Sequence, residues 1–515
     1  MLQSVRLIFT NSFQRSVSIG CTESCAAFSK KAAAPKTTEA EKCKDDPPPL
    51  GQPTPSTHPH LLQNGEVLPG LKLEEFQERR NSLLEKIFQY SALDNETCRR
   101  QHLIVIPSAS KVYMTDKIPY VFRQNTDFLY LSGCLEPDSV LVLSGALGES
   151  CSSTLFVRKK DPHSELWDGP RTGVEEAVKF FGVNDAVPFE DLGSFLTSFG
   201  SRHRDFKLWY DFATPVNSQV HKTIYGLIGE TMNKMWESPK LFVQQLRLRK
   251  SSGEVALMES SCRIASDAIA ATVRSSFPGA TEHLLFARVD YECRARGAEY
   301  LAYPPVVAGG DRANIIHYIS NNQVVRAGEM VLMDAGCEYH GYSSDITRTW
   351  PVSGRFSPAQ RDLYEVVLAV QSDVLRECRH RPSLDALFRA MCCSLGRYLR
   401  EIGLLPRHLS GEELAQAAYK FCPHHVSHYL GMDVHDTPLI PRSIRLEPGM
   451  IITIEPGIYV NKNNAFAPPE FHGLGVRIED DVLITEDGPV VLTAACPKTV
   501  DDVEKLSGAT PVLNL

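Results

Sequence analysis

Two stretches in the second half of the chain decide its fold: EMVLMDAG at residues 329–336 and SSDITRTW at residues 343–350. The first is an apolar run typical of a buried strand, yet it carries Asp334 near its end. The second opens with Asp345 before it continues as a strand. A short turn at residues 339–341 joins the two strands, so the two aspartates are expected to lie within reach of each other. Two ionised carboxylates held close repel unless a proton or a cation lies between them.

A second pair of strands repeats this pattern. MIITIEPG at residues 450–457 is an apolar strand that ends at Glu455, and LGVRIEDDVLI at residues 474–484 is interrupted by three consecutive acids, at 479–481. Periodicity alone does not choose among those three. Because burying an unpaired carboxylate costs several kcal/mol, repeated acids at strand ends favour a metal site. His428, in HHVSHYLG at residues 424–431, is the fifth candidate ligand.

The chemistry of this set indicates the cofactor. Four carboxylates carry a charge of −4, which two divalent cations would neutralise. A set rich in oxygen, with one imidazole and no cysteine, suits manganese better than zinc, so two Mn²⁺ ions are expected. Two such ions bridged by a hydroxide would provide a nucleophile at neutral pH and polarise a carbonyl.

The order of these motifs resembles a known family. Asp, a second Asp eleven residues later, His, Glu and Glu, in the contexts MDAG, SDITRT, VSH, EPG and RIED, are similar to the pita-bread metallopeptidases. That family includes aminopeptidase P, prolidase and methionine aminopeptidase, and the mitochondrial type of aminopeptidase P is the most similar in pattern. The resemblance covers about residues 61–500. It implies that Asp334 binds one metal, that His428 and Glu455 bind the other, and that Asp345 and Glu479 bind both.

The resemblance also implies residues that contact the substrate. His317 would line the pocket, and His424 and His435 would contact the substrate carbonyl and steady the tetrahedral intermediate. Histidine suits this work because its ordinary pKa lies near neutrality. Tyr303 is assigned to substrate contact and to support of the ligands, and Arg477 to support alone. One position departs from the family pattern, because His425 stands where relatives often have glycine; its effect on the substrate wall is left open.

The first half of the chain predicts an α/β domain. Apolar runs at 102–106, 141–143, 155–157 and 208–210 predict strands, and the patterns at 73–87 and 173–181 predict helices. RQNTDFLYLSG at 123–133 and LWDGPR at 166–171 resemble the amino-terminal domain of aminopeptidase P and prolidase, which methionine aminopeptidase lacks. The expected fold class is therefore α/β (α+β), a creatinase/prolidase-like domain followed by a pita-bread metallopeptidase domain.

The domain organisation follows from composition. Residues 1–31 begin with arginines, serines and helically spaced apolar residues, and they have no acid before Glu23, which is typical of a mitochondrial transit peptide. Prolines at 47–49, 53, 55 and 59 indicate a linker over 32–60. The amino-terminal domain is expected at 61–240 and the catalytic domain at 245–505, with a long helix opening at Ser252.

Composition and resemblance together bound the function. The 515 residues carry a net charge of −8 spread along the chain, which argues against a nucleic-acid partner. No apolar run approaches the roughly 20 residues of a membrane-spanning helix, so no membrane partner is expected. The implied function is metal-dependent hydrolysis of the bond between an N-terminal residue and proline, in peptides with proline second, by a mitochondrial homodimer, with a cytoplasmic form as a second location. A prolidase-type dipeptidase and a metal-free binding module are the alternatives. Physiological substrates, the metal in vivo and the transit cleavage site stay open.

Overall fold

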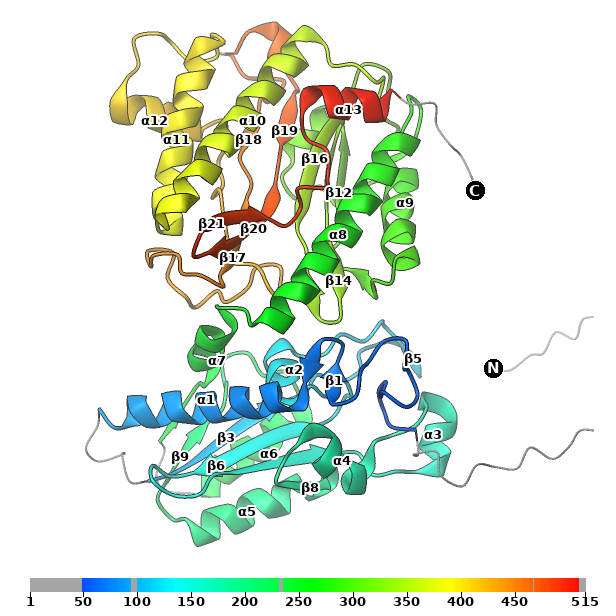
Figure 1. The fold of residues 1–515 in the computed structure, drawn as a ribbon, viewed down its shortest axis with the longest axis vertical. Helices are drawn as coiled ribbons and strands as arrows, with labels where there is room; N and C mark the ends of the chain where they lie inside the picture. Colours follow the sequence, from blue (N-terminus) through cyan, green and yellow to red (C-terminus); the bar gives the residue numbers. More distant parts are fainter. Residues whose placement is uncertain (1–48, 94–99, 231–234, 466, 509–515) are drawn as a thin grey trace, which may run out of the picture. The chain divides into compact units, whose positions relative to one another are not determined.

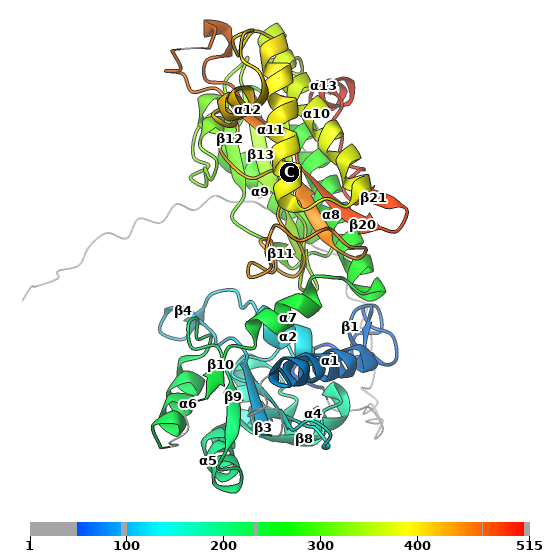
Figure 2. The same ribbon diagram turned by 90° about the vertical axis from the view of Figure 1, so that its left-hand side faces the viewer.

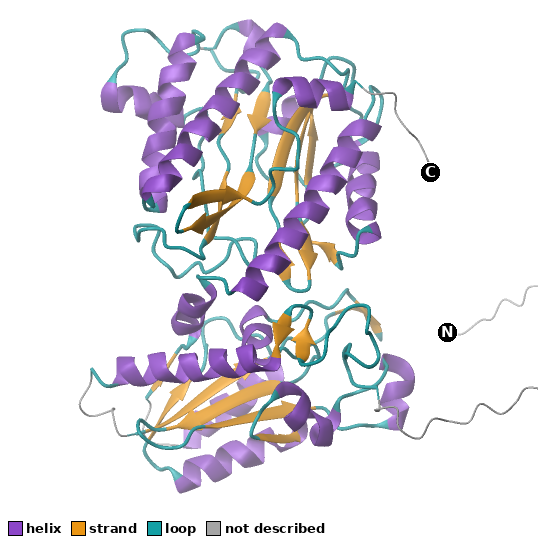
Figure 3. Ribbon diagram, in the orientation of Figure 1, coloured by secondary structure: helices purple, strands orange, loops and turns teal. Residues whose placement is uncertain are grey.

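The computed structural model describes residues 49–93, 100–230, 235–465 and 467–508, and helices and strands follow one another through it (Figure 3). The expected transit peptide and residues 32–48 of the expected linker lie outside the described residues. The described residues all belong to one compact unit. Among the described helices, none is long and apolar enough to cross a membrane.

The ordered chain begins earlier than the expected start near Leu61. Gln52 is buried, and its side-chain amide donates hydrogen bonds to the carbonyls of Val67 (3.3 Å) and Gly133 (3.0 Å). The Leu135 amide in turn donates to Gln52 Oε1 at 2.8 Å. A proline-rich backbone lacks donors, but the buried glutamine supplies side-chain hydrogen bonds in their place. Gln52 is therefore tied to the fold, while Ser56, Thr57, Pro59 and His60 stay exposed.

A six-stranded sheet forms the centre of the first half, in the order β10-β9-β3-β6-β7-β8. β6 runs antiparallel to both β3 and β7, while β9, β10 and β8 join in parallel. Its strands are β3 (Gln101–Pro107), β6 (Val140–Gly145), β7 (Ser152–Val157), β8 (Asp185–Pro188), β9 (Phe206–Trp209) and β10 (Trp236–Glu237). Two small hairpins accompany it, β1 (Glu66–Leu68) with β2 (Leu71–Lys72) and β4 (Tyr113–Thr115) with β5 (Ile118–Pro119).

Both faces of this sheet are covered by helices (Figures 1 and 2). The helices of this half are α1 (Leu73–Ser91), α2 (Thr126–Ser132), α3 (Pro162–Asp168), α4 (Gly173–Phe181), α5 (Leu192–Arg202), α6 (Ser218–Glu230) and α7 (Lys240–Arg247). Ile104 and Ile106 pack in the core that α1 covers, and Leu103 and Val105 pack in the core that α5 and α6 cover. Successive side chains on a strand point to opposite faces, so a continuous apolar run is what a sheet buried on both sides requires.

The second half surrounds short antiparallel strands with long helices (Figure 1). Its helices are α8 (Ser252–Ser275), α9 (Glu282–Ala295), α10 (Pro358–Glu377), α11 (Leu384–Glu401), α12 (Gly411–Tyr419) and α13 (Val500–Ser507). Its strands are β11 (Tyr300–Leu301), β12 (Val306–Gly309), β13 (Met330–Ala335), β14 (Cys337–Tyr339), β15 (Tyr342–Ser343), β16 (Ile346–Pro351), β17 (Ile451–Ile454), β18 (Gly457–Tyr459), β19 (Gly475–Arg477), β20 (Asp480–Thr485) and β21 (Gly488–Val491). The predicted fold class is confirmed: an α/β domain is followed by a second domain in which helices surround antiparallel strands.

The two halves meet through helices rather than through a loop. α7 occupies the expected boundary, and α8 follows directly, opened by a capping box in which Ser251 and Glu254 satisfy each other's backbone N–H groups. Phe76 of α1, Met258 of α8 and Ile451 of β17 belong to one hydrophobic core. The halves therefore share buried apolar surface, which couples their stability.

Candidate metal centre and substrate cavity

Asp334 and Asp345 approach each other through the pairing of β13 with β16. Asp334 lies opposite Thr347 in that ladder, and Asp345 stands just before β16 begins. The Tyr303 hydroxyl reaches both, 2.6 Å from Asp334 Oδ1 and 2.5 Å from Asp345 Oδ1. The chain between the strands is not one simple turn, because β14 and β15 form a hairpin of their own, but the two carboxylates are brought together as the strand pattern predicted.

Glu455 and Glu479 enter the same region from the pairing of β17 with β20. Ile454 pairs with Asp480, so the residues beside them, Glu455 and Glu479, leave the ladder at one end. The Glu479 amide donates to the Thr347 carbonyl at 3.1 Å, and Thr347 Oγ1 donates to Glu479 Oε2 at 2.6 Å. The other two acids of that run point elsewhere: Asp480 pairs with Arg348, and Asp481 accepts from the Asp345 amide.

His428 completes the cluster. Its Nδ1 lies 3.1 Å from the Tyr429 carbonyl, and because a carbonyl only accepts, the ring proton resides on Nδ1. That leaves the Nε2 lone pair 3.3 Å from Asp345 Oδ2 and 3.8 Å from Glu455 Oε1. Asp345, His428 and Glu479 each offer a donor atom within 4.8 Å of the others. A lone pair aimed at carboxylates is unfavourable unless a proton or a cation lies between them.

The electrostatics of the cluster fit bound cations. Burial raises the pKa of Glu455 to about 7, and burial together with the charges of Asp345 and Glu455 raises the pKa of Glu479. Burial also raises the pKa of Asp334, although Arg477 opposes it. Burial works against protonation of His428, but the hydrogen bond with Asp345 and the charge of Glu455 raise its pKa to about 9. Carboxylates that hold protons only because they crowd together release them to a divalent cation.

A cavity of about 730 Å³ opens beside this cluster. His317, His424, His428 and His435 all line it, together with Glu455. The rings of His428 and His435 lie 4.5 Å apart between centroids, at an angle of 69°. The structure therefore brings the three predicted catalytic histidines to one cavity with two of the candidate ligands.

Tyr303 and Arg477 lie on the carboxylates and are not among the residues lining that cavity. Tyr303 was expected to contact substrate, but its hydroxyl is engaged by Asp334 and Asp345. The Arg477 guanidinium donates to Asp334 Oδ2 at 2.6 Å and to the Tyr459 hydroxyl at 2.8 Å. Both side chains are thus placed to hold the carboxylates rather than a peptide.

Two neighbours of the site were missed by sequence reasoning. The Tyr459 hydroxyl accepts from Arg477 and lies 3.0 Å from His424 Nε2, and Thr347 holds Glu479. Thr347 follows Asp345 by two residues, so strand alternation could have placed it on the same face. Tyr459 stands beyond the Pro456-Gly457 turn, where alternation is interrupted and no local signal exists.

His425 is accommodated without disturbing a ligand. Its ring stacks on Phe388, with centroids 4.9 Å apart and planes at 18°, and its Nδ1 lies 2.9 Å from the Ser427 carbonyl. Because it also lines the cavity, the bulky side chain forms part of the wall where glycine would leave space.

The site combines carboxylates around one imidazole with a cavity lined by histidines, and an α/β domain precedes it in the chain. These features together define a class of metallopeptidases. Residues 256–486 match the model of metallopeptidase family M24, and residues 76–209 match the aminopeptidase P N-terminal domain. The chain belongs to the aminopeptidase P family of M24 metallopeptidases.

Individual relatives share most of their length with this chain. Xaa-Pro aminopeptidase 3 of Rattus norvegicus is 46% identical over 467 residues, which cover 90% of this chain and 91% of the relative. Intermediate cleaving peptidase 55, mitochondrial, of Arabidopsis thaliana is 37% identical, with 89% and 87% covered. Among solved structures, proline aminopeptidase P II from Yersinia pestis is 32% identical, with 85% of this chain and 99% of that chain covered and a TM-score of 0.77.

Proposed function

We propose that this protein hydrolyses the bond between the N-terminal residue of a peptide and a proline in second position. Family membership and relatives that bear the name Xaa-Pro aminopeptidase support the coarser statement, that it is a metal-dependent aminopeptidase. The observation that carries the proposal is the group of Asp345, His428 and Glu479, joined by Asp334 and Glu455, beside a cavity lined by three further histidines.

The proposed metal ligands are divided as the family resemblance implies. Asp334 would bind one metal, His428 and Glu455 the other, and Asp345 and Glu479 both. The burial of Asp345 and Glu479, the mutual repulsion of the carboxylates and the position of His428 Nε2 against two of them support this set. Its oxygen-rich character favours manganese. Two bound divalent ions would supply Lewis acidity at the scissile carbonyl and lower the pKa of a water to near neutrality.

The three histidines of the cavity have two proposed roles: one donates a hydrogen bond to the substrate, and two form the cavity wall. His424 Nδ1 donates to the His425 carbonyl at 2.9 Å, and its Nε2 faces the Tyr459 hydroxyl at 3.0 Å. Burial and the charge of Arg477 lower the pKa of His424 to about 4, so the ring is neutral and has no N–H left for a substrate oxygen. His435, whose ring nitrogens have no hydrogen bond to the described residues, is better placed to donate to the carbonyl oxygen as its charge develops. We assign His424 and His317 to the walls that seat the peptide.

A peptide panel tests the proposed function. Purified full-length protein is offered tripeptides with proline or alanine second, and the dipeptides with the same first residue, with added Mn²⁺ and after chelation. Cleavage of the proline tripeptides alone, dependent on metal, is expected. Cleavage of dipeptides in preference to tripeptides would establish the prolidase alternative. If the purified protein holds no metal and hydrolyses no peptide, the metal-free binding module is the remaining alternative.

The division of the chain into segments is also a proposal. We assign residues 1–31 to a mitochondrial transit peptide, 32–60 to a linker, 61–240 to the amino-terminal domain and 245–505 to the catalytic domain. The mitochondrial designation of the Arabidopsis relative supports the location. A reporter fused to residues 1–40 should enter mitochondria, and a reporter that stays in the cytosol would refute the assignment.

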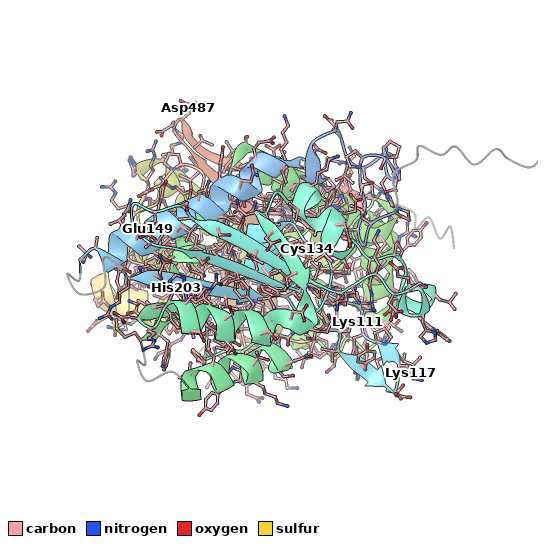
Figure 4. The ribbon with its side chains drawn as sticks, turned by 90° about the horizontal axis from the view of Figure 1, so that it is seen from below. Lys111, Lys117, Cys134, Glu149, His203 and Asp487 are labelled. Carbon is pink, nitrogen blue, oxygen red and sulfur yellow. The ribbon has the colours of Figure 1, made fainter. Side chains whose placement is uncertain are left out.

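A homodimer is the proposed oligomeric state. The β4–β5 hairpin, whose Lys117 is labelled in Figure 4, exposes apolar side chains that a monomer has no reason to leave in water. The exposed fractions are 66% for Val112, 55% for Met114, 55% for Ile118 and 73% for Val121. Light scattering should give twice the chain mass for the wild type, and a monomer mass would end this proposal.

A further inference from the structure

The segment Gly431–Thr437, which carries His435, is held by buried charged side chains that are remote from it in the sequence. At the end of α7, the Arg247 side chain is only 4% exposed. Its Nη1 donates to Asp127 Oδ1 at 2.6 Å, and its Nη2 donates to Asp433 Oδ2 at 2.7 Å and also to Asp436 Oδ1. Arg247 thus ties α2 to both residues that flank Val434-His435.

A second cation completes the grip. Lys250 Nζ lies 3.2 Å from Asp436 Oδ2, and both side chains are 1% exposed. Asp433 also accepts from Thr126 Oγ1 at 2.7 Å and from Arg123 Nη2 at 3.1 Å. The term charge clamp is used below for Arg247 and Lys250 with Asp127, Asp433 and Asp436.

Two features of the segment's backbone fit the charge clamp. A Cβ on Gly431 would lie 2.4 Å from Asp436 Oδ2 and 2.9 Å from Lys250 Cε, so only glycine lets Asp436 and Lys250 come together. Thr437, directly after Asp436, has a φ of +48°, a conformation that a β-branched residue adopts only when its surroundings impose it. The Asp436 amide donates to the Tyr429 carbonyl at 2.9 Å and closes the loop.

The His435 ring receives no such support directly. No hydrogen bond to its ring nitrogens is recorded among the described residues, and its ring contact is the one with His428 at 4.5 Å. The direction of the ring therefore depends on where the backbone of Asp433–Asp436 is held. Reacting groups displaced by 1 Å can cost about 100-fold in rate, so a rigid support matters to turnover even though it touches no substrate.

We propose that Arg247 is a positioning residue that aims His435 into the substrate cavity through the charge clamp. This rests on the proposed function, because it assumes that His435 acts on the substrate oxygen. The consequence is that residues of the first half and of α7 control turnover in a site whose candidate ligands all come from the second half.

The test compares Arg247→Met and Arg247→Lys with a matched control, Arg249→Met. Arg249 lies two residues away and pairs with Glu447 at the surface, where the side chains are 64% and 55% exposed. We expect kcat to fall about 100-fold in Arg247→Met and about 10-fold in Arg247→Lys. Lysine keeps the positive charge but lacks the two guanidinium nitrogens that contact different aspartates at once. KM and metal content should stay within about threefold of wild type, and Arg249→Met should match wild type in all of them.

A double-mutant cycle separates positioning from general damage. Once His435 is removed, nothing remains for Arg247 to position, so Arg247→Met with His435→Ala should be no slower than His435→Ala alone. A double variant whose loss of kcat equals the product of the two single losses would overturn the proposal, and so would a loss of metal in Arg247→Met. If Arg247→Met does not fold, Asp433→Asn replaces it, because that side chain is 33% exposed and its loss frees only one end of the clamp.

Amide exchange gives a readout that does not need catalysis. Exchange of the Asp436 amide should accelerate at least tenfold in Arg247→Met, while β3 amides keep the wild-type rate. Unchanged exchange at Asp436 would overturn the clamp even if turnover fell. Should the wild type cleave no peptide at all, the proposed function fails, and the exchange result still decides whether the charge clamp holds the segment.

Discussion

The six-stranded sheet of the first half and the strand ends around the candidate metal centre bury polar groups in opposite ways. In the sheet, His102 is neutral: Trp209 Nε1 donates to its Nδ1 at 2.9 Å, and burial together with the charge of Lys207 lowers its pKa to about 4. At the metal centre, His428 is surrounded by carboxylates that raise its pKa to about 9. The pKa values of the two histidines therefore differ because His102 lies among apolar side chains near the charge of Lys207, whereas His428 faces the carboxylates of Asp345 and Glu455.

The two regions therefore serve different purposes. The sheet neutralises its single buried imidazole and gains stability from apolar packing on both faces. The strand ends gather four carboxylates whose repulsion only protons or cations relieve, so that region trades stability for affinity. Substitutions in the sheet should therefore lower the stability of the protein, whereas substitutions at the metal centre should lower its metal binding and turnover.

The largest expected effect comes from removing a carboxylate shared by both proposed metals. Asp345→Asn keeps the volume but removes one charge from the centre of the cluster. Turnover should fall roughly 1,000-fold or more, with a circular dichroism spectrum close to that of the wild type and a Tm no lower than that of the chelated wild type. Asp487→Asn, in the exposed turn labelled in Figure 4, is the control and should be fully active. Near-normal turnover of Asp345→Asn with its metal retained would refute the shared-ligand assignment.

Removing the proposed donor should cost nearly as much. Because His435 faces an oxygen that gains charge only as the reaction proceeds, His435→Ala should lower kcat by roughly 100- to 1,000-fold with little change in KM. Metal content, measured by atomic emission, should be unchanged. A raised KM with normal kcat would make His435 a binding residue, and loss of metal would place it among the ligands or their supports.

Metal removal should expose the contrast between the two regions in stability. A metal present at 100 times its Kd adds about 2.7 kcal/mol to the folded state, which corresponds to a fall in Tm of roughly 3–5 °C on chelation for a unit of this size. Amide exchange should accelerate around β16, β17 and β20 and stay unchanged in β3 and β6. An unaltered Tm after complete removal of metal would contradict a tightly clustered carboxylate site.

The smallest effect concerns the sheet. The folded pKa of His102, about 4, lies below its ordinary 6.5, so the unfolded chain binds the proton first. His102 therefore leaves stability intact above about pH 6.5 and lowers the free energy of unfolding progressively as pH falls from 6.5 to 4. His102→Gln cannot be protonated, so its urea-unfolding free energy should fall less than that of the wild type over this window. His163→Gln, at an exposed position, should follow the wild type, and equal pH slopes in all three proteins would contradict a neutral buried His102.

The amino-acid sequence by itself determined the elements and the order of the chemistry. The helix predicted at 173–181 coincides with α4, because its apolar spacing and the following Gly182 in the left-handed conformation are local features. Acids at the ends of apolar strands stood out for the same reason, since each anomaly is visible within eight residues. The ordered set of five motifs then indicated the family, which the matches to the M24 and aminopeptidase P models confirm.

Only the tertiary structure decided which distant side chains complete the site. Tyr303 reaches Asp334 and Asp345 across 31 and 42 residues, and Arg247 reaches Asp127, Asp433 and Asp436 across 120, 186 and 189 residues. Gln52 likewise finds Gly133 across 81 residues, inside a stretch whose prolines predicted a linker. A contact between remote residues leaves no trace in local periodicity, because it is made by the path of the strands and by which side chain remains to fill a buried gap. The strand pattern could place the carboxylates together, and the family resemblance could name Tyr303 and Arg477 as supports. The carboxylate oxygen that each of them contacts was fixed only when the chain had folded around it.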